Sequence, residues 1–154
     1  MLLWRAKLPE TWLKNVRQQL HGVLVDHAHL ERKAATSAIN LQKYVELRHA
    51  TRELNSIAIE ELQHFNQVLD LLAERNVPLS TPVKSPWIST MMAQIRKGRR
   101  HQVIDHLVAC ALIEGRSCEK FQILAQSVAD LDPGLAAFYA SLVESEGNHY
   151  ATYL

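Results

Sequence analysis

The sequence predicts an all-α protein that folds as a four-helix bundle. Apolar residues recur every three or four positions along four long segments, which is the spacing of one helical face. Five glycines and five prolines are few for 154 residues, so long helices are favoured over many turns. With 47% hydrophobic residues the chain can bury one core, and we expect residues 1–154 to form a single domain.

The first two helices form one predicted hairpin. Pro9 suits the first turn of a helix, and the apolar stripe that follows it continues to about Leu41. A short turn at residues 42–45 leads to a second helix, which ends near Asn76. The polar residues on the apolar stripes of this hairpin include His27, Glu31 and Glu61.

A second predicted hairpin follows a long connection. Residues 77–86 contain three prolines and form a crossover loop, and residues 87–97 can form a short helix. The third long helix covers about residues 101–128, and the fourth begins at the capping pair Asp132-Pro133. Short turns within each hairpin and a long crossover between the hairpins are typical of a ferritin-like bundle.

A glutamate interrupts the apolar stripe of every long helix. A buried carboxylate without a partner is costly, so it is normally neutralised, paired or bound to metal. No lysine or arginine occupies the same stripes. In the second and fourth helices a histidine follows the glutamate three residues later, which brings both side chains to one region of the helix surface. The six residues are Glu31, Glu61, His64, Glu114, Glu146 and His149.

We expect these side chains at one depth in the bundle, because residues equidistant from the turn of an antiparallel hairpin face each other. Glu31 and Glu61 are each 15 residues from position 46. Glu114 and Glu146 are each 16 residues from position 130. Both pairs therefore lie about 22–24 Å from their turns. Two glutamates and two Glu-x-x-His motifs are the ligands of di-iron bundles, so the sequence predicts a dinuclear metal site.

Two nearby patterns are weaker candidates for ligands. A third Glu-x-x-His motif, at Glu46 and His49, lies off the apolar stripe and beside the first turn, where no opposite helix can supply a partner. Glu60 is four residues before His64, but it also lies off the stripe. We therefore expect neither pattern to bind metal.

Three further residues lie one turn from a glutamate of the predicted site. We interpret His27 as a core histidine or a support for a ligand rather than as a ligand. Cys110 and Cys118 lie one turn on either side of Glu114, and we expect them to pack as small hydrophobic side chains. About 12 Å of helix separates the two thiols, which is too far for a disulfide. Free thiols suit a cytoplasmic protein.

The ligand set and composition limit the cofactor and the partners. Many carboxylates with two imidazoles favour iron or manganese over copper or zinc. We expect two iron ions, because this ligand set supports O2 activation. The net charge of +1 gives no general attraction to a membrane. We expect no membrane span and no signal peptide, since no stretch approaches about 18 apolar residues and residues 1–7 lack an apolar run.

Four segments around the glutamates resemble one family, the tRNA 2-methylthio-isopentenyladenosine hydroxylases. The resemblance extends over nearly the whole chain, from about Pro9 to Leu154. Its most specific parts are Arg-Ser-Cys-Glu at residues 116–119 and Asp-His-Ala-x-x-Glu at residues 26–31, because many di-iron proteins share the ligand spacing alone. The four segments are residues 26–35, 60–69, 113–121 and 145–150.

The resemblance implies an oxygen-dependent monooxygenase. Its substrate would be the isopentenyl group of a hypermodified adenosine in tRNA, next to the anticodon. It implies a di-iron centre, O2, an external electron donor and an electron-transfer partner. By this resemblance the iron ligands are Glu31, Glu61, His64, Glu114, Glu146 and His149, with no catalytic residue beyond them.

A basic cluster offers a contact for the anticodon arm of tRNA. Its members could neutralise phosphates, and they are Arg96, Lys97, Arg99 and Arg100. Without the resemblance, a solvated helix junction is the simpler interpretation of these four residues.

Two other functions share parts of this pattern. A ferritin- or rubrerythrin-like ferroxidase or peroxidase uses the same bundle and ligands, although rubrerythrins commonly add a Cys-x-x-Cys module that this sequence lacks. A non-catalytic helical RNA-binding protein with a degenerate site is the second alternative. Iron binding separates that protein from the enzymes.

Overall fold

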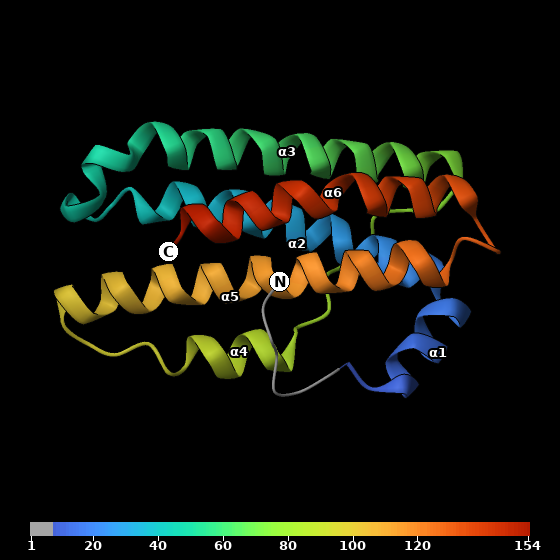
Figure 1. The fold of residues 1–154 in the computed structure, drawn as a ribbon, viewed down its shortest axis with the longest axis horizontal. Coiled ribbons are helices and arrows are strands. Elements are labelled where there is room, and N and C mark those ends of the chain that lie inside the picture. The colour runs from blue at the N-terminus through green and yellow to red at the C-terminus, as the bar shows by residue number, and fades with distance from the viewer. Residues whose placement is uncertain (1–7) are drawn as a thin grey trace. The chain divides into compact units, whose positions relative to one another are not determined.

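The structure is a computed structural model that describes residues 8–154. The prediction that no signal peptide is present concerns residues 1–7 and lies outside the described residues. Residues 8–154 form six α-helices and one short 3-10 helix without any strand, so the predicted all-α class is confirmed (Figure 1). None of these helices is both long and apolar enough to cross a membrane.

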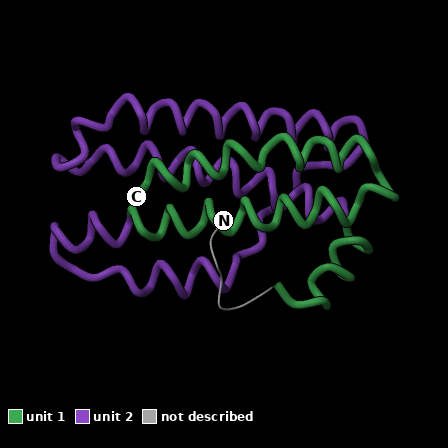
Figure 2. Tube along the Cα trace, in the orientation of Figure 1, with its two compact units in different colours: residues 1–19, 107–154 green, residues 20–106 purple. Residues whose placement is uncertain are grey.

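The chain divides into two compact units (Figure 2). Unit 1 contains the described residues up to Gln19 together with Leu107–Leu154, and unit 2 contains Leu20–His106. The first predicted hairpin lies in unit 2 from Leu20 onward, and the second lies in unit 1 from Leu107 onward.

Unit 2 contains α2 (Leu20–Leu41) and α3 (Thr51–Glu74), which pack against each other as the predicted hairpin (Figure 1). Their contact buries the apolar stripes that the spacing indicates. The connection between them contains a 3-10 helix, η1 (Val45–Ala50), where the sequence predicts the start of the second long helix, so α3 begins later than predicted. The buried apolar residues of α2, η1 and α3 are Leu24, Val25, Ala28, Ala35, Ala38, Leu41, Leu47, Leu54, Ile57, Ala58, Val68 and Leu72.

The prediction of one continuous helix from Pro9 to about Leu41 is wrong. Gln19 leaves the helical conformation, with φ −131° and ψ 42°, and it separates α1 (Glu10–Gln18) from α2. The Gln19 N–H donates to the carbonyl of Val16 at 3.1 Å, which closes the last turn of α1. Two separate helices, α1 and α2, therefore replace the single predicted helix.

The end of α3 has a specific cap. Asn76 adopts the left-handed conformation with φ 53°. Its N–H donates to the carbonyl of Ala73 at 3.0 Å, and the N–H of Val77 donates to the carbonyl of Leu72 at 2.9 Å. This pair of hydrogen bonds is the Schellman cap, and it explains why the helix ends close to the predicted position.

The crossover loop and the short helix after it are confirmed, but the helix is shorter than predicted. Residues 77–85 are irregular, and α4 (Pro86–Met92) ends before the predicted limit of residue 97. Gly98 has φ 101°, which most side chains disfavour, so it separates the residues after α4 from α5 (Arg99–Ser127).

Unit 1 contains α1, the larger part of α5 and α6 (Pro133–Thr152). The predicted cap of the last helix is confirmed, because the Asp132 side chain accepts a 2.9 Å hydrogen bond from the N–H of Leu135. Phe121 on α5 stacks on Tyr139 on α6 with ring centroids 5.6 Å apart. This stacking joins the inward faces of the two helices of the second hairpin.

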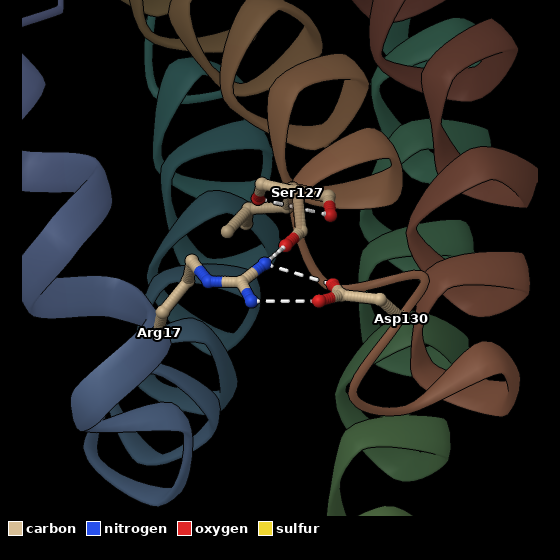
Figure 3. Close-up of polar contacts among 4 residues, drawn as sticks. Arg17, Ser127 and Asp130 are labelled. Atoms are coloured by element: carbon tan, nitrogen blue, oxygen red, sulfur yellow. Dashed lines mark hydrogen bonds and ion pairs between the residues drawn. The ribbon is translucent and has the colours of Figure 1, made fainter.

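Within unit 1, α1 is attached to the turn between α5 and α6. The Arg17 guanidinium donates two 2.8 Å hydrogen bonds to the Asp130 carboxylate and a third hydrogen bond to the carbonyl of Ser127 (Figure 3). The neighbouring Val16 side chain is buried. A bidentate ion pair and a hydrogen bond from Arg17, together with the burial of Val16, therefore hold this short helix.

Candidate metal centre

Unit 2 brings together three of the six predicted ligands. Glu31 lies on α2, and Glu61 and His64 lie one turn apart on α3. All three side chains are buried. One possible ligand atom from each residue lies within 4.8 Å of the others, which is close enough for all three to contact one ion.

The two oxygens of Glu31 face different groups. Oε1 accepts a hydrogen bond from Nε2 of His27, one turn earlier on the same helix. Oε2 lies 3.5 Å from Nδ1 of His64. Burial alone raises the pKa of Glu31. The charge of His27 and hydrogen bonds with His27, His64 and Glu61 lower it, so that the net pKa is well below its ordinary value.

Unit 1 brings together the other three predicted ligands. Glu114 lies on α5, and Glu146 and His149 lie one turn apart on α6. All three are buried, and one possible ligand atom from each lies within 4.8 Å of the others. Each unit therefore contains one glutamate from the first helix of its hairpin and a Glu-x-x-His motif from the second.

This set of donors fits divalent metal ions. The four glutamates are at most 3% exposed, and no lysine or arginine of residues 8–154 is buried to the same degree. Carboxylate oxygens with imidazole nitrogens are the donors that iron and manganese accept.

Comparison with known proteins identifies the family. Residues 2–154 match the family described as tRNA-(MS[2]IO[6]A)-hydroxylase (MiaE). The chain belongs to this family. The sequence-based resemblance, which rested on residues 26–35 and three other segments, is thereby confirmed.

Two relatives carry the same name, tRNA 2-(methylsulfanyl)-N(6)-isopentenyladenosine(37) hydroxylase. The chain is 36% identical over 147 residues to the Pseudomonas putida protein, and the match covers 95% of this chain and 70% of that protein. It is 41% identical over 95 residues to the Salmonella typhimurium protein, and this match covers 62% of this chain and 34% of the relative. Both names support the hydroxylase prediction rather than a ferroxidase, a peroxidase or a non-catalytic RNA-binding protein.

A solved structure supports the predicted fold class. Protein 43 with aldehyde deformylating oxygenase activity, from Synechococcus, matches this chain with a TM-score of 0.89 and 35% sequence identity. The match covers 99% of this chain and 76% of that chain. Because that neighbour has a ferritin-like di-iron fold, the ferritin-like fold predicted for this MiaE-family chain is confirmed.

The weaker candidates lie where the sequence analysis expected them. Glu46 and His49 are exposed on η1, so this third Glu-x-x-His motif is not part of either buried cluster. Glu60 is only half-buried beside the buried Glu61. The spacing of the apolar stripe therefore separated the buried motifs from the exposed one.

Both cysteines are free thiols, as predicted. Burial, together with the nearby charge of Glu114, raises the pKa of Cys110 to about 12. In the metal-free protein this thiol is therefore protonated at neutral pH. Cys118 is half-buried and donates to the carbonyl of Val143 at 3.5 Å.

The predicted basic cluster is partly engaged within unit 2. The side chain of Arg96 donates hydrogen bonds of 2.8 and 2.6 Å to the Asp105 carboxylate. The Nε of Arg99 lies 2.9 Å from a carboxylate oxygen of Glu46 on η1. Sequence reasoning missed both acidic partners, because their positions depend on the conformation of the loop before α5 and of η1.

Proposed function

We propose that this chain is an oxygen-dependent di-iron monooxygenase that acts on tRNA. The proposed reaction hydroxylates the isopentenyl group of 2-methylthio-isopentenyladenosine next to the anticodon. One oxygen atom of O2 enters a C–H bond of that group, and two electrons from an external donor with two protons reduce the other atom to water. The observation that carries the proposal is family membership combined with two buried Glu-x-x-His clusters.

We further propose that the two clusters together bind two iron ions in one domain formed by residues 1–154. The support comes from the sequence, in which each glutamate pair is 15 or 16 residues from its turn, and from the donors that each unit holds. The proposed ligands are Glu31, Glu61, His64, Glu114, Glu146 and His149. Iron would supply the activation of O2, and manganese is the alternative ion with the same donor preference.

The residues of the chain have a simpler task than the metal in this proposal. The carboxylates balance the charge of two divalent cations, and the buried surroundings exclude water from them. The imidazole nitrogens of His64 and His149 would each hold one ion together with the glutamates of the same unit. None of these tasks requires a further acid or base from the chain.

A contact surface for the anticodon arm is also proposed, in unit 2. Arg96 and Arg99 remain more than half exposed despite their carboxylate partners, and Lys97 and Arg100 are exposed between and beside them. The ion pairs lower the net charge of the cluster. We therefore expect Lys97 and Arg100 to make the main phosphate contacts, with Arg96 and Arg99 fixing the surface.

The metal proposal is tested by anaerobic loading with Fe(II) followed by iron analysis. The native chain is expected to bind about two irons, and Glu114→Ala is expected to bind markedly less. The loaded protein is then given modified tRNA, O2 and a chemical reductant, and the nucleosides are analysed by mass spectrometry for one added oxygen. Bound iron without an oxygenated nucleoside would contradict the substrate, whereas absence of bound iron would contradict the site.

The tRNA surface is tested by binding measurements at several salt concentrations. Lys97→Gln with Arg100→Gln is expected to weaken tRNA binding and to reduce the salt slope by about two. Lys14→Gln, which removes an exposed charge from α1, is the matched control and is expected to change neither quantity beyond a small general effect. Unchanged binding in the double variant would exclude this surface.

A further inference from the structure

A buried histidine outside the proposed ligand set contacts one of the ligands. His27 is 4% exposed, and its Nε2 forms a hydrogen bond with Oε1 of Glu31. The other oxygen of Glu31, Oε2, lies 3.5 Å from Nδ1 of His64. The carboxylate therefore has one oxygen directed to a neighbour on its own helix and the other directed to the Glu-x-x-His motif on α3.

We propose that His27 is a positioning residue that holds Oε1 of Glu31, so that Oε2 is the oxygen offered to a metal ion beside His64. This inference rests on the proposed di-iron site. It makes His27 a partner of a ligand rather than a ligand, and it assigns a separate task to each oxygen of Glu31.

The hydrogen-bond chemistry supports this division. A proton on Nε2 gives the imidazole of His27 an N–H donor for the carboxylate. A ligand whose second oxygen is held in this way loses less freedom when an ion binds. Partners of this kind orient metal ligands, and their loss typically lowers metal affinity 10–100-fold.

The second hairpin has a different residue at the matching position. Cys110 lies four residues before Glu114, as His27 lies four residues before Glu31. A thiol is a weak hydrogen-bond donor, so Cys110 cannot hold Glu114 as an imidazole holds Glu31. The positioning effect is therefore expected for the ion bound in unit 2 alone.

His29 provides a matched control on the same helix. It is also a buried histidine, two residues from both His27 and Glu31. Its Nε2 lies 2.7 Å from the carbonyl of Ser80, and its Nδ1 lies 3.2 Å from the guanidinium of Arg32. The first contact joins the crossover loop to α2 and the second lies within α2. Loss of His29 therefore tests the general effect of removing a buried imidazole.

The experiment measures anaerobic Fe(II) binding by the full-length chain and its variants, with circular dichroism to check folding. His27→Leu is expected to bind one of two irons 10–100-fold more weakly. His27→Gln, which retains an N–H donor, is expected to recover most of that affinity, and His29→Leu is expected to bind iron as the native chain does. In a Glu31→Gln background, His27→Leu is expected to cause no further loss, because the effect acts through Glu31.

Each contrary result has a distinct meaning. Native affinity in His27→Leu would overturn the positioning role while leaving the metal site intact. If His27→Gln loses one iron completely, as Glu31→Ala would, His27 is a ligand and the proposal is wrong. Equal losses in the native and Glu31→Gln backgrounds would also overturn it, since the effect would then bypass Glu31, and this comparison remains informative if His27→Leu alone is poorly folded. No iron on the native chain would reject the proposed function and this inference together.

Discussion

Cys110 and Cys118 show how position on one helix determines the chemistry of two identical side chains. Cys110 is buried, and burial together with the charge of Glu114 raises its pKa to about 12. Burial also raises the pKa of Cys118, but this side chain is only half-buried. The thiolate is the reactive form of cysteine, so the two residues differ in both ionisation and access.

We predict that an alkylating reagent modifies Cys118 much faster than Cys110 in the folded, metal-free protein at pH 8. The expected rates differ by at least about tenfold, because the pKa of Cys110 leaves very little thiolate and its burial excludes the reagent. Mass spectrometry after timed labelling measures the two rates. Cys118→Ser should leave only the slow reaction, and Cys110→Ser should retain the fast one. Rapid labelling of Cys118→Ser would show that Cys110 is accessible.

The sequence was sufficient to select the candidate ligands but not their individual contacts. Glu61 and His64 were selected because their spacing and the neighbouring apolar residues fix which side of the helix is buried. The contact between His27 and Glu31 depends on side-chain rotamers, which helical spacing does not determine. The sequence alone therefore did not decide whether His27 is a core histidine or a support for a ligand.

At the scale of helices, the break at Gln19 shows a limit of hydrophobic periodicity. The apolar spacing continues from Val16 through Leu20 to Leu24, because one non-helical residue barely disturbs a three-four pattern. No glycine or proline marks the break. The ends of α3 and α6 were easier to place, since Asn76 and Asp132-Pro133 have recognised capping conformations.

The attachment of α1 gives a prediction about pH. The hydrogen bonds from Arg17 lower the pKa of Asp130 below its ordinary value of 3.8. A carboxyl group with a lowered folded-state pKa adds stability above the unfolded-state pKa and loses it as the pH falls through the folded-state pKa. We predict that Arg17→Gln lowers Tm at pH 7 by about 2 °C or less, because the pair is exposed. The difference from the native chain should decrease below about pH 4.

Thermal unfolding followed by circular dichroism between pH 3 and pH 7 measures this effect, and limited proteolysis near Gln19 reports the release of α1. Lys14→Gln removes a charge from an exposed position on the same helix and is the matched control. A pH-independent difference for Arg17→Gln would show that its contact with the carbonyl of Ser127, rather than the carboxylate of Asp130, stabilises α1 (Figure 3).

For the whole molecule, the plan of two helical hairpins follows from the sequence because each hairpin repeats one arrangement. A glutamate on the first helix and a Glu-x-x-His motif on the second are brought together in each unit by antiparallel pairing at equal distance from a turn. Contacts that depend on loop conformation did not follow, and the pair of Arg99 with Glu46 is the clearest case. Regular spacing therefore predicts which candidate ligands lie together in a helical hairpin better than it predicts the ion pairs on the surface.

The buried carboxylates should lower the thermal stability of the metal-free protein. In unit 1, one carboxylate oxygen of Glu114 and one of Glu146 lie within 4.8 Å of each other. Two negative charges would therefore be close together and buried away from water. We predict that Glu114→Gln raises the Tm of the metal-free protein by about 3–6 °C, through the loss of one buried charge. The same variant should lose most of the increase in Tm that Fe(II) gives the native chain. That increase reflects a stabilisation of about 2.7 kcal/mol for each site at a metal concentration 100-fold above Kd.

Paired thermal scans with chelator and with anaerobic Fe(II) provide the measurement. Glu144→Gln on α6, an exposed position two residues before Glu146, is the control and should alter neither scan appreciably. A stabilised metal-free Glu114→Gln that no longer responds to iron would mean that the carboxylate is kept for binding the ion at the expense of stability, as at other functional sites. A destabilised metal-free variant would instead mean that Glu114 is an ordinary structural partner in unit 1, and the metal assignment for α5 would then be wrong.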